Sequence, residues 1–188
     1  ASEGAIAKTL SNVTIGQPVI YQNLVMFPLL GEGRSTLRYL TLNEGLEQGV
    51  VEIGEVDSAG SVSELQLVNR GKVPVLLVDG EELVGAKQNR ILTVSLLAPS
   101  ETAVTIPAAC VEAGRWASVS QHFRSVDRVQ FASGRANLAA DVSLSLREMG
   151  APIANQSTVW NDIAAKAQLL DVHSSTEAMA DVFEENES

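Results

Sequence analysis

The sequence predicts an α+β protein, with an antiparallel-dominated β-sheet or sandwich core over about residues 12–107 followed by C-terminal α-helices. Up to residue 107 the apolar residues fall in short runs with strand periodicity, separated by glycine, proline and polar turn segments. Beyond residue 137 the apolar spacing changes to that of amphipathic helices, and strands followed by helices are typical of α+β folds. A chain of 188 residues with 45% hydrophobic content suits one folded domain, so we expect a single domain over residues 1–188.

The expected strands follow one another along the first two thirds of the chain. Branched and aromatic residues favour extended structure in each of them. In the segment 91–97, Leu92, Val94 and Leu96 alternate with polar residues, which predicts one half-buried strand. Between the second and third strands, residues 37–48 hold a short helical turn that ends at Gly49. Strands are expected at residues 13–21, 24–29, 50–56, 65–68, 73–78, 91–97 and 102–106.

Three helices are expected after the sheet. Residues 137–148 place Leu138, Val142 and Leu146 at steps of four, which predicts a helix that ends near Gly150. A second helix is expected over residues 158–170. The pattern Ser174-x-x-Glu177 is a capping box, which predicts a third helix over about residues 175–183.

Composition bounds the cellular setting. The apolar runs are far shorter than the roughly 20 residues that cross a bilayer, so no membrane partner is expected. No basic segment followed by an apolar core begins the sequence, so no signal peptide is expected. A single cysteine excludes an intramolecular disulfide, and together these features favour a reducing cytoplasm.

Charge is distributed unevenly along the chain. The net charge is −10, yet residues 70–135 carry eight basic and six acidic residues. This segment is therefore +2, and the remainder is −12. A locally basic segment in an acidic protein favours a small anionic ligand in a pocket over a nucleic-acid duplex, which the acidic surroundings would repel. The alternative is that the uneven distribution of charge arises by chance and has no functional meaning.

The first polar cluster is the segment Asp79-Gly-Glu-Glu-Leu-Val-Gly-Ala-Lys-Gln-Asn-Arg90, between two apolar runs. Lys87 and Arg90 supply positive charge there, and Asn89 can donate and accept hydrogen bonds. Glycines in the same segment let backbone N–H groups approach a phosphate. A solvated hairpin loop is the alternative interpretation. The segment lacks the spacing of a Walker loop.

The second polar cluster is Cys110-Val-Glu-Ala-Gly-Arg-Trp116 and the residues up to 128. Arginine offers a planar fork for phosphate and Trp116 offers a face on which a base can stack. His122 is a candidate general acid or base near neutral pH. Core packing for Trp116 and a plain surface position for His122 are the alternatives.

The sequence gives little support for a metal site or for catalysis by the Cys110 thiol. Two histidines and one cysteine, widely spaced, do not make a zinc site. Asp79, Glu81 and Glu82 offer oxygen ligands for magnesium, but three acids in one strand connection are weak evidence. We expect no metal and no cofactor, and a buried, inert Cys110.

The residues 80–90, Ile106-Pro107, 110–116, Trp160 and Ala178-Met179 resemble a prokaryotic family, the ARG and rhodanese-phosphatase-superfamily-associated protein domain. The resemblance spans nearly the whole chain. Members of the family are regarded as ring nucleases of type III CRISPR antiviral defence, which degrade cyclic oligoadenylate second messengers. The positions that carry over are Lys87, Asn89, Arg90, Glu112 and Arg115.

The resemblance implies a metal-independent phosphodiesterase, or ring nuclease, whose partner is a small cyclic RNA. Attack by the substrate's own 2′-hydroxyl would give linear products with a 2′,3′-cyclic phosphate and would need neither metal nor protein nucleophile. A ring with near two-fold symmetry would fit a homodimer. A non-catalytic module that binds a nucleotide or an ADP-ribose-like ligand is the alternative. The expected catalytic residues are Lys87, Asn89, Arg90 and His122, and the expected substrate-binding residues are Glu82, Glu112, Arg115, Trp116, Arg124 and Arg128.

Overall fold

The computed structural model describes residues 2–31 and 37–185 of the chain. These residues form two compact units, one up to residue 37 and one from residue 38 onward. A single domain over residues 1–188 stays a prediction.

The first unit contains a helix and four short strands. α1 (Ser2–Ser11) precedes β1 (Val13–Ile15), β2 (Val19–Tyr21), β3 (Leu24–Met26) and β4 (Leu29–Gly31). β1 pairs with β4 and β2 pairs with β3, both antiparallel, so the two expected strands are confirmed as the arms of an interrupted hairpin. Each arm is interrupted at a proline, which cannot donate to a strand ladder.

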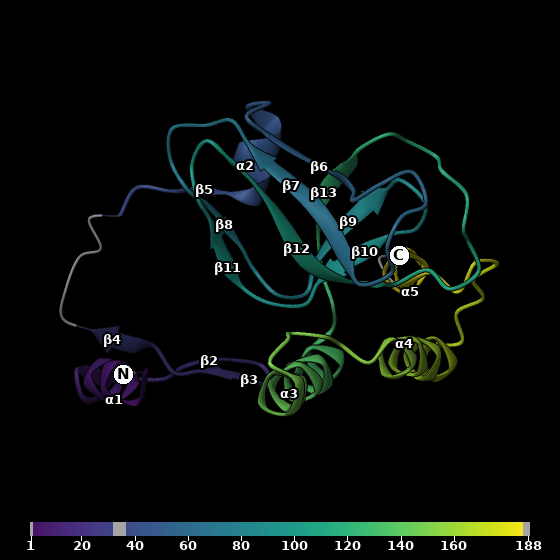
Figure 1. Cartoon of the computed structure of the whole chain (residues 1–188). Helices are drawn as coiled ribbons and strands as arrows, with labels where there is room; N and C mark the ends of the chain where they lie inside the picture. The colour runs from purple at the N-terminus through teal and green to yellow at the C-terminus, as the bar shows by residue number, and fades with distance from the viewer. Residues whose placement is uncertain (1, 32–36, 186–188) are drawn as a thin grey trace. The chain divides into compact units, whose positions relative to one another are not determined.

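The second unit is built around a six-stranded antiparallel sheet (Figure 1). The strand order is β13-β9-β10-β12-β7-β6, and the outer strands β13 and β6 contact each other, so the sheet curls into a half-barrel. The antiparallel-dominated α+β fold is therefore confirmed. The strands are β6 (Val51–Glu55), β7 (Glu64–Asn69), β9 (Glu81–Gly85), β10 (Arg90–Leu92), β12 (Thr102–Cys110) and β13 (Phe123–Val129).

A small second sheet and a short helix pack against the inside of the half-barrel. The sheet has the order β11-β8-β5, in which β5 (Leu40–Thr41) runs parallel to β8 (Val75–Leu77) and β11 (Leu96–Ala98) runs antiparallel to it. α2 (Leu42–Glu47) is fixed at its start by a capping box between Thr41 and Glu44. The inner core contains mainly leucine, isoleucine and valine from these elements.

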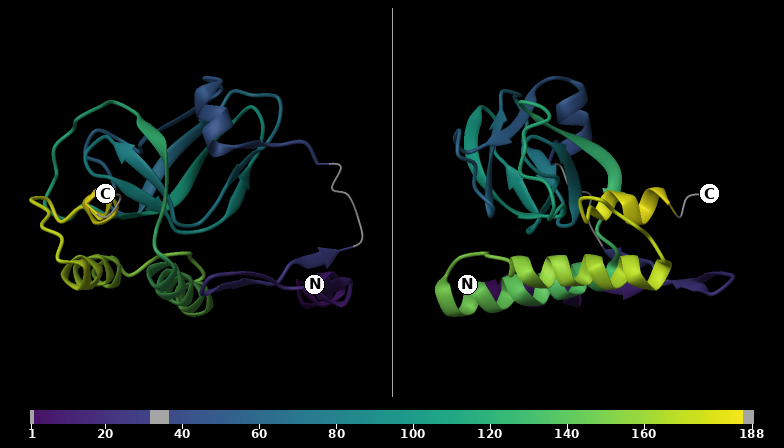
Figure 2. Two further views of the ribbon diagram at one scale, coloured as in Figure 1. Left: turned by 180° about the vertical axis from the view of Figure 1, so that it is seen from behind. Right: turned by 90° about the vertical axis from the view of Figure 1, so that its right-hand side faces the viewer.

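Three helices follow the sheet: α3 (Ala132–Met149), α4 (Gln156–Leu170) and α5 (Met179–Glu184). α3 and α4 run side by side next to the half-barrel (Figure 2). Strand alternation sends Leu92 into the inner core and Ile91 into a second core with these helices. The sheet therefore has two covered faces, and this decides which polar residues can meet.

Three sequence predictions need correction. The strand expected over 91–97 is two strands, β10 and β11, which belong to different sheets because the chain turns at residues 93–95. The sheet does not end near residue 107, because β12 continues to Cys110 and β13 follows it. The third helix begins at Met179 and not near residue 175, because Glu177 lies in the left-handed region at φ 54° and cannot start a helix.

None of the helices in the described ranges combines the length and the hydropathy that a bilayer crossing requires.

Candidate functional site

The two polar clusters meet at one end of the half-barrel, where three connections converge. These are the β9–β10 turn at residues 86–89, the β6–β7 loop at residues 56–63 and the β12–β13 loop at residues 111–122. Backbone hydrogen bonds join the first and the third of these: Ala117 N–H donates to Lys87 O at 3.2 Å, and Val119 N–H donates to Ala86 O at 3.0 Å. Ala86 itself has a φ of 42°, so this turn is held in an uncommon conformation by its neighbours.

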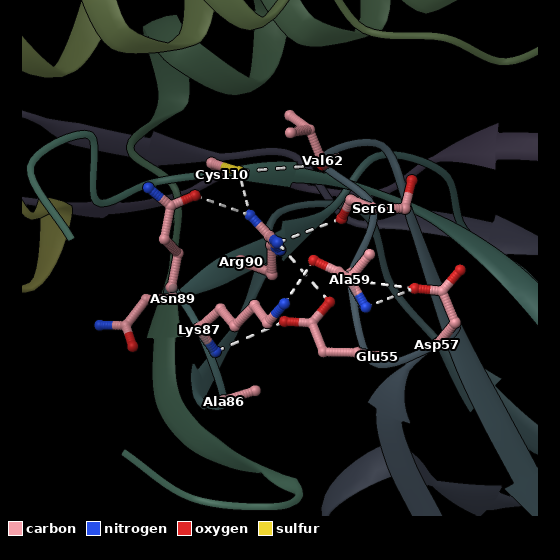
Figure 3. A network of polar contacts seen from close by, with 12 residues as sticks. Glu55, Asp57, Ala59, Ser61, Val62, Ala86, Lys87, Asn89, Arg90 and Cys110 are labelled. Carbon is pink, nitrogen blue, oxygen red and sulfur yellow. Dashed lines mark hydrogen bonds and ion pairs between the residues drawn. The ribbon is translucent and has the colours of Figure 1, made fainter. Parts of the chain in front are cut away.

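Arg90 forms the buried centre of the cluster (Figure 3). Its guanidinium donates to Ser61 O and to Gln88 Oε1, each at 3.1 Å, and also contacts the Cys110 sulfur. Glu55 Oε2 lies 3.8 Å from Arg90 Nη2 and gives the buried cation a partner. The side chain of Arg90 has no exposed surface, so its predicted catalytic role stays a prediction.

Lys87 lies nearer to solvent and ties two of the connections together. Its ammonium donates to Ser58 O at 2.7 Å and also to Ala59 O. An ammonium has three N–H donors, so one remains for a ligand. The Trp116 ring lies 5.4 Å from Lys87 Nζ and 5.6 Å from Arg90 Cζ, which is within cation–π range for both.

Arg115, Glu112 and Asn89 form the polar link between the two motifs. Arg115 Nη2 donates to Glu112 Oε2 at 2.6 Å and to Asn89 Oδ1 at 3.1 Å, and Nη1 donates to Ala86 O at 2.9 Å. Glu112 Oε2 also accepts from Asn89 N–H at 3.1 Å. Burial raises the pKa of Glu112, but the hydrogen bonds from Arg115 and Asn89 outweigh it, so the pKa is lowered and the carboxylate stays ionised. These side chains fix the turn that carries Lys87.

A cavity of about 470 Å³ opens beside this cluster. Its size lies in the range of small-ligand sites. Lys87 and His122 both line it, together with residues of β6, β7 and the two loops. His122 Nδ1 lies 3.4 Å from Glu52 Oε1, which leaves Nε2 for a ligand. A hydrogen bond from Arg70 lowers the pKa of Glu52. Burial opposes this shift and the positive charge of His122 adds to it. The imidazole of His122 therefore faces an ionised carboxylate.

Three carboxylates line the cavity, and each already has a partner. Glu52 accepts from Arg70 at 2.9 Å, and Glu55 lies beside Arg90. Asp57 accepts from the N–H groups of Ala59 and Gly60, both at 2.8 Å. Their repulsion of an anionic ligand is therefore reduced, although they still favour a ligand that also offers hydroxyl donors.

Three of the predicted substrate-binding residues lie on the sheet face opposite to Arg90, on the strands that pack against the C-terminal helices. Glu82 is fully buried there and accepts from Arg128 Nε at 2.7 Å, while Arg128 also donates to Glu184 of α5 at 2.8 Å. Burial raises the pKa of Glu82 even though Arg128 opposes the shift. Arg124 is exposed and pairs in register with Val84 on this same face. These residues therefore do not join the cluster around Lys87, and their role in binding stays a prediction.

The acids at the start of the first motif diverge in space. Asp79 binds Ser95 and Arg135, and Glu81 accepts from Val78 N–H. Glu82 points to Arg128. No group of three histidine, cysteine or acidic side chains suited to a metal is found among the described residues. Burial raises the pKa of the Cys110 thiol to about 11.

Glu52 and Glu55 are site residues that the sequence prediction missed. Their strand alternates Val51, Ile53 and Glu55 on its inner face, so the third of these positions places a charge toward the core. For Glu55, a charge on the buried face of a strand was the available signal, whereas Glu52 lies on the other face and gave no such signal. The partners of both acids lie far away in the sequence, and only the closed sheet brings them together.

The fold and the cavity define a small α+β protein whose candidate site is built from connections at one end of a curled antiparallel sheet. The chain belongs to the ARG and Rhodanese-Phosphatase-superfamily-associated Protein domain family, whose model matches residues 12–188. This confirms the family predicted from the two motifs. No curated protein and no solved structure matches the chain.

Proposed function

We propose that this protein is a cytoplasmic, metal-independent phosphodiesterase that opens cyclic oligoadenylate messengers of type III CRISPR antiviral signalling. The observation that carries the proposal is that one cavity contains both a proton acceptor, His122, and a cation, Lys87. The acceptor is oriented by Glu52, in the manner of a histidine paired with a carboxylate in hydrolytic sites.

The chemistry follows from what these side chains can do. His122 Nε2 takes the proton from the ribose 2′-hydroxyl, and the 2′-oxygen attacks the adjacent phosphorus. The bond from phosphorus to the 5′-oxygen breaks, and that oxygen leaves with a proton from solvent. The remaining N–H of Lys87 stabilises the charge on the phosphoryl oxygens. The product is a linear oligonucleotide with a 2′,3′-cyclic phosphate at one end and a 5′-hydroxyl at the other.

The same side chains, His122 and Lys87, also support a ribonucleotide as the class of substrate. Chemistry that uses neither a metal nor a protein nucleophile draws its nucleophile from water or from the substrate, and a ribonucleotide linkage carries one in its 2′-hydroxyl. A cavity of about 470 Å³ suits one nucleotide unit, so the rest of a ring would lie over its open side. A second copy of the chain would cover that side in the homodimer that we also propose; full activity of a monomer in size-exclusion chromatography would remove the dimer.

A second candidate is a non-catalytic module that binds a nucleotide or an ADP-ribose-like ligand. The specific observation in its favour is that Arg90 and Arg115 already have internal partners. The cavity instead offers carboxylates and the side chains of Gln66 and Gln121, which suit ribose hydroxyl groups.

Turnover and affinity, measured separately on cyclic tetra-adenylate, distinguish the two. His122→Ala should reduce kcat by about 100-fold or more while the dissociation constant changes little. His173→Ala, at the other histidine, is the matched control and should leave both values unchanged. Lys87→Met should also reduce kcat, with Lys72→Met as its control. Tight binding by the parent protein without turnover would support the binding module.

A further inference from the structure

A second cavity lies between α4 and the chain segment that leads into α5. Its volume is about 420 Å³, and it shares no lining residue with the cavity that contains His122. One wall is apolar and consists of Trp160, Ile163, Ala164 and Ala167, which occupy one face of α4 at helical spacing. The other wall carries polar side chains, so the cavity is amphipathic.

The polar wall includes two carboxylates without partners. The side chains of Asp171 and Glu177 are exposed at this wall, and neither makes a hydrogen bond or an ion pair with a residue in the described ranges. These two carboxylates are therefore available to a ligand.

The backbone that carries these two acids is held in place. Asp171 ends α4 at φ 56°, and Glu177 lies at φ 54°, a region that residues other than glycine seldom adopt. The segment around Glu177 is fixed on both sides: Ala178 N–H donates to Ser174 Oγ, and Gly114 N–H donates to Thr176 O, each at 2.8 Å. The polar wall is thus formed before a ligand arrives.

We propose that this cavity is a binding site for a small organic amine. The ammonium group pairs with the carboxylates of Asp171 and Glu177, and an apolar body packs on Trp160 and the two alanines of α4. An aromatic face near a cation adds to such binding. Anionic ligands are rejected, because two unpaired carboxylates face them. The proposal does not rest on the phosphodiesterase activity.

Calorimetric titration of the full chain with phenethylamine, and with phenylacetate as an anion of similar shape, tests the site. Phenethylamine should bind once per chain with a dissociation constant of about 1 mM or lower, a strength within reach of small ligands. Phenylacetate should not bind at the same concentrations. Equal binding of the two, or no binding of the amine at several millimolar, would overturn the proposal.

Variants then locate the binding. Asp171→Asn combined with Glu177→Gln should weaken phenethylamine at least about fivefold, since each charge contact is partly exposed. Glu101→Gln is the matched control, because Glu101 is also exposed, also has a positive φ of 53° and lies outside this cavity. Ala164→Phe fills the cavity from an exposed position of α4 and should abolish binding. Undiminished binding by Ala164→Phe would place the amine elsewhere and refute the assignment.

Discussion

Replacement of Arg90 by methionine tests the most buried charge of the site. The substitution keeps an unbranched apolar chain but removes the guanidinium, which is completely buried. It leaves Glu55, whose side chain is 11% exposed, without its cation, and it removes the donors to Ser61 O and Gln88 Oε1. Removing one partner of a buried pair costs about 3–5 kcal/mol. Because Lys87 N–H still reaches Glu55 Oε1 at 3.4 Å, we expect about 3 kcal/mol.

Urea unfolding followed by circular dichroism measures this loss. With a slope of about 2 kcal/mol per molar urea, the midpoint should fall by about 1.5 M. Arg124→Met is the control on β13 of the same sheet; Arg124 is exposed, so its change should stay within about 0.5 kcal/mol.

A double variant separates the pair from general loss of packing. Arg90→Met with Glu55→Gln removes the stranded charge together with its partner, so it should be less destabilised than the sum of the two single variants. If Arg90→Met alone unfolds within about 1 kcal/mol of the parent protein, or if the single effects simply add, the buried pair does not support the site as described.

Three further predictions concern other parts of the sheet. Cys110 is buried with a pKa of about 11, so alkylation at pH 8 should be about 100-fold slower than for an ordinary thiol until urea unfolds the chain; rapid native labelling would contradict this. Burial raises the pKa of Glu82 above 4.5, so its ionisation destabilises the fold as pH rises through that raised value. The stability of Glu82→Gln relative to the parent should therefore increase from about pH 4 to about pH 7 in urea titrations, and a constant difference would count against it. Gly85→Ala would place a Cβ 2.5 Å from Ser120 Oγ at φ 132°, so it should cost at least about 1 kcal/mol, and an unchanged Tm would show that the turn is not constrained.

Much of the fold was predictable because strand and helix periodicity are local properties. The paired strands β6 and β7 and the helix α4 lie close to their expected ranges, whereas α3 begins at Ala132 and not at residue 137. The switch at residues 93–95 was not predictable, because alternation continues through a turn that moves the chain between two sheets. β13 was not predicted, because Arg124 and Arg128 interrupt its apolar residues and its burial follows no regular alternation.

The candidate site was predictable only in part. The two motifs do meet, as the contacts of Arg115 with Asn89 and of Trp116 with Lys87 show. The sequence could not show that Glu82 and Arg128 face the helices, because a residue's face depends on strand register. Nor could it show that the Arg90 guanidinium is buried and contacts Ser61 and Glu55, which lie far away in the sequence. Some residues support the candidate site and others are open to a ligand. The two kinds can be distinguished only when the folded sheet has brought distant strands together.

Product analysis in EDTA tests the central claim most directly. The parent protein and His122→Ala are incubated with cyclic tri-, tetra- and hexa-adenylate, and the products are separated by chromatography. The account predicts linear products that end in a 2′,3′-cyclic phosphate from the parent protein, and intact rings from the variant. Rings that stay intact with the parent protein, both in EDTA and with added magnesium or manganese, would contradict it.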